Sequence, residues 1–258
     1  MLLSSADITA FIGAWLWPLF RIGAMVMSAP VFGARSVPVR ARLVITLALT
    51  LIIAPLIPPV PVVDLLSPLT LLIIIQQILI GVVMGFTAQL VFSAVITGGQ
   101  VISMQMGLGF SVMVDPQNGT QAPVLSQFYV LFAILVFLAL DGHLVMIQIL
   151  ADSFKTLPVG VEGLQAMDYR QIASWGSQVF AGGLAISLPA IASLLVVNIA
   201  FGVMTRAAPQ LNIFAIGFPV TMICGFSLIL ITLPGVLPRT GILFTGVYQF
   251  LRQIMGGL

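Results

Sequence analysis

Apolar residues run through this chain in long blocks, and charged residues stand almost entirely between the blocks. The longest block, Leu65 to Val114, is roughly 50 residues without a charged side chain. As a straight helix it would be about 75 Å long, whereas the hydrocarbon core of a bilayer is about 30 Å thick. The block must therefore fold back, which predicts bent or broken helical hairpins rather than one straight crossing.

The same pattern predicts about six hydrophobic segments, three of them too long for one untilted crossing. Gly98-Gly99 predicts a bend before residues 100–106, and Pro219 and Pro234 are expected to divide the last long segment. The approximate segments are residues 9–32, 43–63, 68–92, 123–140, 171–205 and 207–238, followed by an amphipathic tail over 243–254 that we expect at an interface or on a partner.

Composition agrees with this pattern. Hydrophobic residues make up 60% of the chain, charged residues 6%, and the mean hydropathy is +1.21. A typical soluble domain is about 25% charged. We therefore expect an all-α integral membrane protein, organised as one membrane-embedded domain over residues 1–258.

The few charged residues give an orientation. Arg35, Arg40 and Arg42 stand in one short loop that has no acid. The positive-inside rule places this loop in the cytoplasm and the N-terminus outside. Arg21 interrupts the first segment, and an arginine at such a position usually faces protein or water rather than lipid. Asp168 with Gln171 resembles a capping box that opens a helix at Tyr169.

Enzymatic chemistry has little support in the sequence. No P-loop motif surrounds the one lysine, Lys155, and one histidine, His143, cannot form an HExxH zinc motif. The lone Cys224 excludes an intramolecular disulfide framework. No basic patch with interleaved aromatic residues suggests a nucleic-acid partner. We expect no enzyme activity, no cofactor and no metal.

The sharpest positive signal is the irregular end of the longest block. It interleaves flexible or aromatic apolar groups with glycines before a turn, and non-helical backbone at membrane depth survives only inside protein or along a water-filled path. This combination points to a pore or gate. The candidate plug residues are Met104, Met106, Gly107, Gly109, Phe110, Met113, Val114 and Asp115.

Two further sets of residues are candidates for packing and subunit contact. Gly81 and Gly85 form a stripe of small residues that permits close helix packing. Arg206, Pro209, Gln210 and Asn212 cluster between two very apolar runs, where they suit a subunit contact or the orientation of a broken helix.

Several motifs in order make the chain resemble the FliR family of bacterial type III protein export. They begin with Arg21 and Ser28-Ala-Pro-Val-Phe-Gly33 and continue through Gly98 to Phe110 and Val114-Asp-Pro116. They then include Pro123 to Phe128, Asp141-Gly-His143, Ser153-Phe154, Arg206 and Pro209 to Asn212, so that the resemblance covers essentially the whole chain.

The resemblance implies a core subunit of the flagellar export gate in the bacterial inner membrane, at the flagellar basal body. Such a subunit forms a hetero-oligomeric helical assembly with FliP- and FliQ-like subunits, cooperates with FlhB and FlhA, and passes unfolded flagellar proteins. The family's plug corresponds to Gly107 to Asp115, with Phe110 as the obstructing side chain. Apolar segments would then be buried against partner subunits as well as against lipid.

Two other functions are compatible with the residues alone. The first is a homologous subunit of a virulence type III secretion system, which would serve a different cargo. The second is a stand-alone secondary transporter, since such proteins also contain broken helices. A transporter is expected to purify alone or as a small homo-oligomer.

Overall fold

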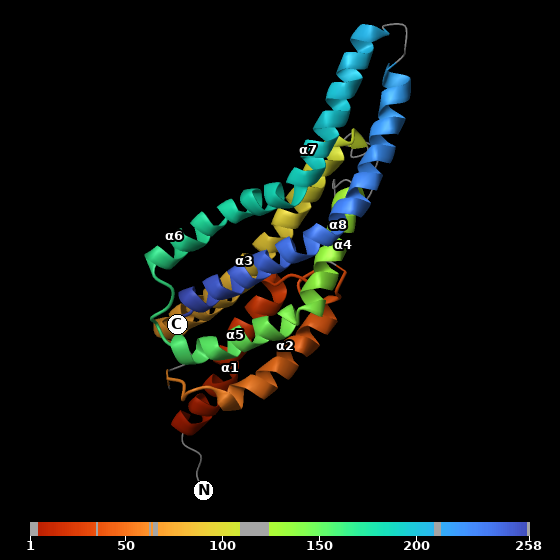
Figure 1. Cartoon of the computed structure of the whole chain (residues 1–258). Coiled ribbons are helices and arrows are strands. Elements are labelled where there is room, and N and C mark those ends of the chain that lie inside the picture. Colours follow the sequence, from red (N-terminus) through yellow and green to blue (C-terminus); the bar gives the residue numbers. More distant parts are fainter. Residues whose placement is uncertain are drawn as a thin grey trace. The chain divides into compact units, whose positions relative to one another are not determined.

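The computed structural model describes residues 5–34, 36–61, 63, 67–108, 124–208 and 213–256. Every regular element in these ranges is helical, which confirms the predicted all-α class. The elements are α1 (Ser5–Ser28), α2 (Val39–Ile53), the short 3₁₀ helix η1 (Ala54–Leu56), α3 (Pro68–Gln105), α4 (Val124–Ala139), α5 (Gly142–Thr156), α6 (Ala166–Trp175), α7 (Ser177–Ala207) and α8 (Ile213–Ile254) (Figure 1).

Among the described residues, five helical stretches are long and apolar enough to cross a membrane. The number becomes six if the pair α4 and α5 counts as one broken span. This agrees with the about six segments expected from the sequence. The stretches are Thr9–Ser28, Val39–Leu56, Pro68–Gln105, Ala166–Ala207 and Gly217–Ile254.

The chain divides into two compact units. Unit 1 contains residues 1–90, 141–175 and 244–258, and unit 2 contains residues 91–140 and 176–243. The long helices α3 and α8 contribute to both units. That residues 1–258 act as one membrane domain stays a prediction.

In unit 1, α1 packs against α2 and α3, and the C-terminal end of α8 closes the core. Val247, Leu251 and Ile254 are buried on the predicted apolar face of that end, and Thr245, Gln249 and Arg252 are exposed opposite. The tail is amphipathic as predicted. The tail is the last part of α8, and the apolar residues Val247, Leu251 and Ile254 pack inside unit 1 of the chain itself.

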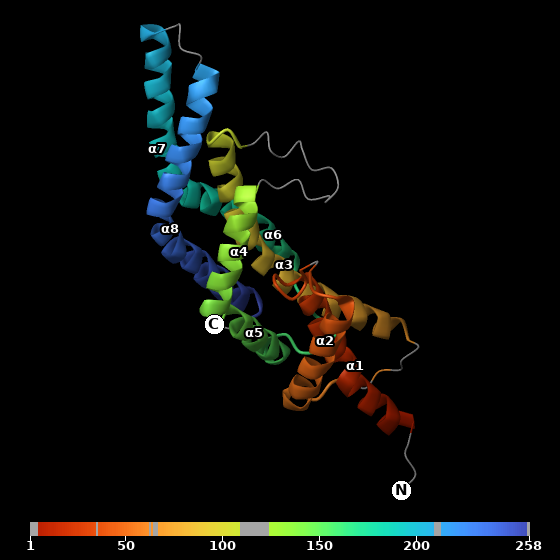
Figure 2. The same ribbon diagram turned by 90° about the vertical axis from the view of Figure 1, so that its right-hand side faces the viewer.

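In unit 2, α7 and the first part of α8 form an antiparallel hairpin (Figures 1 and 2). Gly98 of α3 lies against α7, where an added Cβ would be 3.0 Å from the Gly183 carbonyl oxygen. Gly99 faces α4, where an added Cβ would be 3.0 Å from the Cα of Ser126. Phe92 and Phe137 meet edge to face with centroids 5.8 Å apart.

Gly98 and Gly99, where a bend was predicted, lie inside α3, which continues through them as one helix, and they let two other helices approach closely. Two local predictions were wrong. Pro219 and Pro234 lie inside α8 and do not divide it. Each proline leaves one backbone carbonyl of the preceding turn without its helical N–H donor, and membrane helices tolerate this where neighbouring groups satisfy the carbonyl. The helix expected to open at Tyr169 begins at Ala166.

The start of α6 shows why its boundary was misplaced. The backbone N–H of Gln165 donates to Asp168 Oδ2 at 2.7 Å. Asp168 therefore acts from the third helical position back onto the residue before the helix, which is the second half of a capping box. The sequence reading had placed Asp168 itself before the helix.

Candidate gate site

The site begins where α3 ends. Met106 donates its backbone N–H to Ile102, and Gly107 donates to Met104 at 3.0 Å. Gly107 has φ +78°, a left-handed conformation that closes many helices and that favours glycine. The chain thus leaves the helix at Gly107, the first residue of the stretch Gly107 to Asp115 that the resemblance assigns to the plug.

The two described methionines of the plug differ in environment. Met106 is fully buried in unit 2 against Gly225 of α8, where an added Cβ would lie 2.8 Å from its sulfur. Met104 is 64% exposed. Met106 therefore joins α3 to α8 inside unit 2, and Met104 is the one of the pair that is free to contact another molecule.

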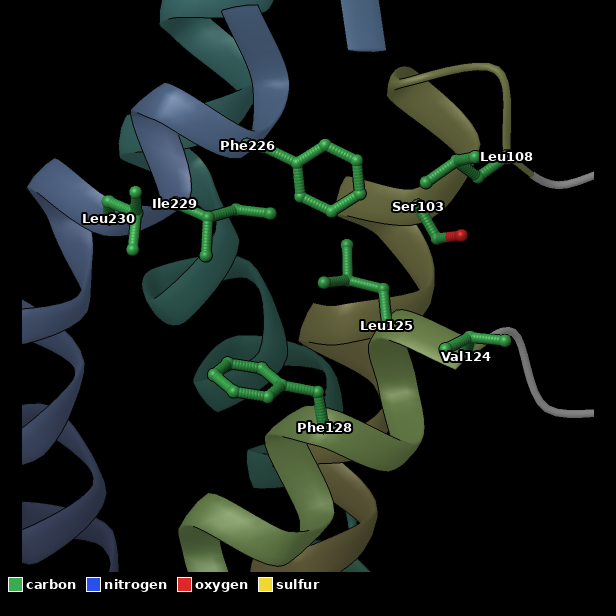
Figure 3. A pocket seen from close by; sticks show the side chains of 8 residues that line it. All are labelled: Ser103, Leu108, Val124, Leu125, Phe128, Phe226, Ile229 and Leu230. Atoms are coloured by element: carbon green, nitrogen blue, oxygen red, sulfur yellow. The ribbon is translucent and has the colours of Figure 1, made fainter. Parts of the chain in front are cut away.

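An apolar cavity of about 490 Å³ lies beside the end of α3. Leu125 and Phe128 of α4 face Phe226 and Ile229 of α8 across it, and Ser103 of α3 supplies a hydroxyl (Figure 3). The Ser103 hydroxyl is buried and makes no hydrogen bond in the described structure. Leu108, Val124 and Leu230 complete the lining. The cavity thus adjoins the described residues on either side of the plug segment.

The remaining plug residues lie outside the described part of the chain. They are Gly109, Phe110, Met113, Val114 and Asp115. Their role stays a prediction.

Gly81 and Gly85 lie in unit 1, on the face of α3 that contacts α1. A Cβ at Gly81 would contact the Arg21 carbonyl oxygen and lie 2.8 Å from the Ala24 Cβ. A Cβ at Gly85 would contact the Ser28 hydroxyl and lie 2.6 Å from the Ala29 nitrogen. Both glycines are therefore used for packing within the chain, and their part in a subunit contact stays a prediction.

The two described arginines of the predicted orientation loop differ in environment, and the orientation role of the loop stays a prediction. Arg40 is exposed, whereas Arg42 is half-buried and donates from Nη2 to the Ala34 carbonyl oxygen at 2.6 Å. Arg35 lies outside the described residues. Arg42 thus stabilises the turn between α1 and α2 through this hydrogen bond. The sequence analysis had used Arg42 only for membrane orientation and did not predict this local role.

In the second predicted contact cluster, one residue is described. Arg206 is exposed in the last turn of α7, where a cation complements the negative end of the helix dipole. Pro209, Gln210 and Asn212 lie outside the described residues. Within the described part of the chain, no group of three His, Cys, Asp or Glu side chains could hold a metal ion.

Sequence reasoning missed the cavity walls. Phe128, Phe226 and Ile229 come from helices about a hundred residues apart, and each reads as an ordinary apolar position in its own segment. These side chains meet only in the tertiary structure, and no local sequence motif indicates that they line one cavity.

Replacing Gly107 tests the geometry of the helix end. Gly107→Val is expected to lower the free energy of unfolding by about 1–2 kcal/mol, since a left-handed conformation costs that much for a residue with a Cβ. The Phe218 ring, 3.3 Å from an added Cβ, adds crowding. Gly107→Asn should lose less, because Asn tolerates this conformation. Thermal unfolding of the detergent-purified chain measures both, and equal losses would contradict the helix-end role.

The sequence was compared with protein families and with known proteins. A family model described as bacterial export proteins, family 1, matches residues 12–247. The chain is 41% identical over 251 residues to the flagellar biosynthetic protein FliR of Escherichia coli K12, covering 96% of this chain and 95% of the relative. It is 38% identical to the protein of that name from Pectobacterium carotovorum, covering 98% and 96%. It is 27% identical to the protein of that name from Bacillus subtilis, covering 94% of each chain.

Proposed function

The chain belongs to family 1 of the bacterial export proteins, the family of flagellar biosynthetic protein FliR, and from this membership we propose that it is a core subunit of the flagellar type III protein export gate. With FliP- and FliQ-like subunits it would form a gated channel for unfolded flagellar proteins. The observation that carries the proposal is the near full-length similarity to proteins named for flagellar biosynthesis. The family-model match over residues 12–247 spans the candidate gate site.

The surface of the helices supports a membrane-embedded subunit. Large apolar side chains are exposed on α7 and α8, including Leu195, Val196, Ile199, Ile223 and Leu230, each more than half exposed. Leu195 and Ile199 are four residues apart and so lie on one face of α7, and exposed apolar patches mark contact with lipid or with another protein. A subunit that is covered partly by hydrocarbon and partly by partner helices needs such a surface on more than one face.

The plug proposal rests on the resemblance and on the end of α3. Gly107 turns the chain out of a helix at the point where the family's plug begins. In the proposed closed gate, Phe110 obstructs the path and Met113 and Val114 pack around it, since thioether and aromatic groups seal an apolar constriction. Met104, which is exposed, would contribute from the end of the helix.

The remaining parts of the proposal concern place and partners. The chain would lie in the bacterial inner membrane at the flagellar basal body and cooperate with FlhB and FlhA. Its contribution is a path and a constriction rather than a chemical step.

Deleting the gene from the source bacterium tests this function. Swimming and secretion of flagellar filament and hook proteins are expected to disappear and to return when the chain is supplied from a plasmid. Loss of virulence effector secretion with normal swimming would favour a virulence system instead. Normal swimming together with unchanged secretion of both kinds would contradict an export function and favour a stand-alone transporter.

A further inference from the structure

Arg21 is a fully buried cation in the middle of α1. Within the described part of the chain the one ion pair is Lys155 with Asp152, on the surface, so no described carboxylate neutralises Arg21. A buried charge without compensation is costly, above all in a segment apolar enough to span a membrane. Among the described residues, its charge is balanced by dipoles.

Three separate nitrogens of Arg21 find acceptors. Nε donates to Gln77 Oε1 of α3 at 2.8 Å. Nη1 donates to the carbonyl oxygen and the hydroxyl of Ser153 at 2.9 and 3.0 Å, and Nη2 donates to the carbonyl oxygen of Leu157 at 2.8 Å. The guanidinium carbon also lies 4.2 Å from the centre of the Phe154 ring. All of these groups belong to unit 1.

The acceptors explain how a lone cation is tolerated. Ser153 and Leu157 lie at the C-terminal end of α5, which carries the negative end of the helix dipole. The Ser153 carbonyl oxygen accepts from the Leu157 backbone N–H as well as from Arg21, whereas the Leu157 carbonyl lies beyond the last helical residue, Thr156. The face of Phe154 adds a cation–π contact. The planar guanidinium presents several donors in a fixed geometry, so that one side chain can join α1, α3 and the end of α5.

The neighbouring residue on α3 contacts the same connection further along. Gln76 Oε1 touches the backbone of Gly163 closely enough that a side chain at Gly163 would clash with it. Residues 157–165 link α5 to α6 and, with Gln76, line a cavity of about 680 Å³. The connection is therefore hydrogen-bonded to Arg21 at Leu157, and at Gly163 it packs against Gln76 of α3, whose Oε1 is buried without a hydrogen-bond partner.

We propose that Arg21 is a positioning residue: its guanidinium fixes the end of α5, and thereby places the 157–165 connection and its polar cavity against α3. This role does not require a partner, and it does not depend on the proposed export function. A residue that merely filled the core would be replaceable by an apolar side chain of similar length. A positioning residue would not be, because three acceptors at the end of α5 would lose their donor.

Cysteine crosslinking in native membranes measures the placement. In the full-length chain with Cys224→Ser, the pair Gln76→Cys and Gly163→Cys is expected to crosslink readily, since a Cβ at Gly163 would lie 3.5 Å from Gln76 Cγ. Adding Arg21→Met should slow crosslinking about ten-fold, the scale of one charge-assisted hydrogen bond. Arg252→Met, which removes an exposed cation of unit 1, should leave the rate unchanged.

A second variant keeps the proposal testable if Arg21→Met fails to accumulate. Arg21→Lys retains the charge but places all its donors on one nitrogen, which cannot reach Gln77, Ser153 and Leu157 together. Its crosslinking is expected to be about three-fold slower than that of the parent chain. Parental rates in Arg21→Met, or in Arg21→Lys where the methionine variant does not fold, would overturn the positioning role.

Discussion

Deleting residues 110–114 is expected to make cells that contain the assembled export complex leak small ions at several times the normal rate. In the proposed gate these residues supply the apolar side chains that obstruct the path, and a shortened segment leaves the constriction open to water. The leak is measured as the collapse rate of a proton gradient in inverted membrane vesicles that carry the chain with its FliP- and FliQ-like partners.

Two single substitutions sharpen that experiment. Phe110→Ala should reproduce part of the leak, because Phe110 is the proposed obstructing side chain. Asn118→Ala, in the same segment but beyond the proposed plug, should leave permeability at its normal level. If the deletion variant assembles in normal amounts and remains as tight as the parent, the plug assignment is wrong.

Adding one methyl group at Gly81 and one at Gly85 is expected to destabilise unit 1 substantially. Each new Cβ would meet backbone atoms of α1 that cannot move aside, such as the Ser28 carbonyl carbon, 2.7 Å from a Cβ at Gly85. Overpacking of this kind costs about 1–3 kcal/mol per site. For a chain of this length the double variant should therefore unfold about 5 °C or more below the parent.

Gly202→Ala is the matched control. Gly202 lies inside α7 with no heavy atom within 4 Å of an added Cβ. Because alanine favours a helix by about 1 kcal/mol over glycine, this variant should unfold at the same temperature or higher. A parental melting temperature for the Gly81 and Gly85 double variant would contradict the close contact between α1 and α3.

The class and the approximate segments could be predicted from the sequence because both depend on the same property, the length of apolar runs between charges. The cost of placing Arg21 in lipid predicted that it faces protein or water, and the structure buries it in protein. Its partners could not be predicted, since Ser153 and Leu157 lie more than 130 residues away. Hydropathy measures how apolar each side chain is, but it does not indicate which residues contact one another in the fold.

Helix bends or ends were predicted at residues that usually interrupt helices, although the tertiary structure keeps these helices continuous. Gly98, Gly99, Pro219 and Pro234 are helix breakers in water, but each lies inside a continuous helix here. In the candidate gate site, Gly107 was predicted as part of an irregular, glycine-containing segment, and the structure adds that it ends α3 with φ +78°. The cavity beside it was missed because its walls come from three helices.

The most direct test of the account is to purify an affinity-tagged copy of the chain in mild detergent from the source bacterium and to identify by mass spectrometry the proteins that come with it. Export-gate membership predicts that FliP- and FliQ-like proteins co-purify in fixed ratios in a single large particle. Recovery of the chain alone, or as a small homo-oligomer, from the same membranes would contradict it.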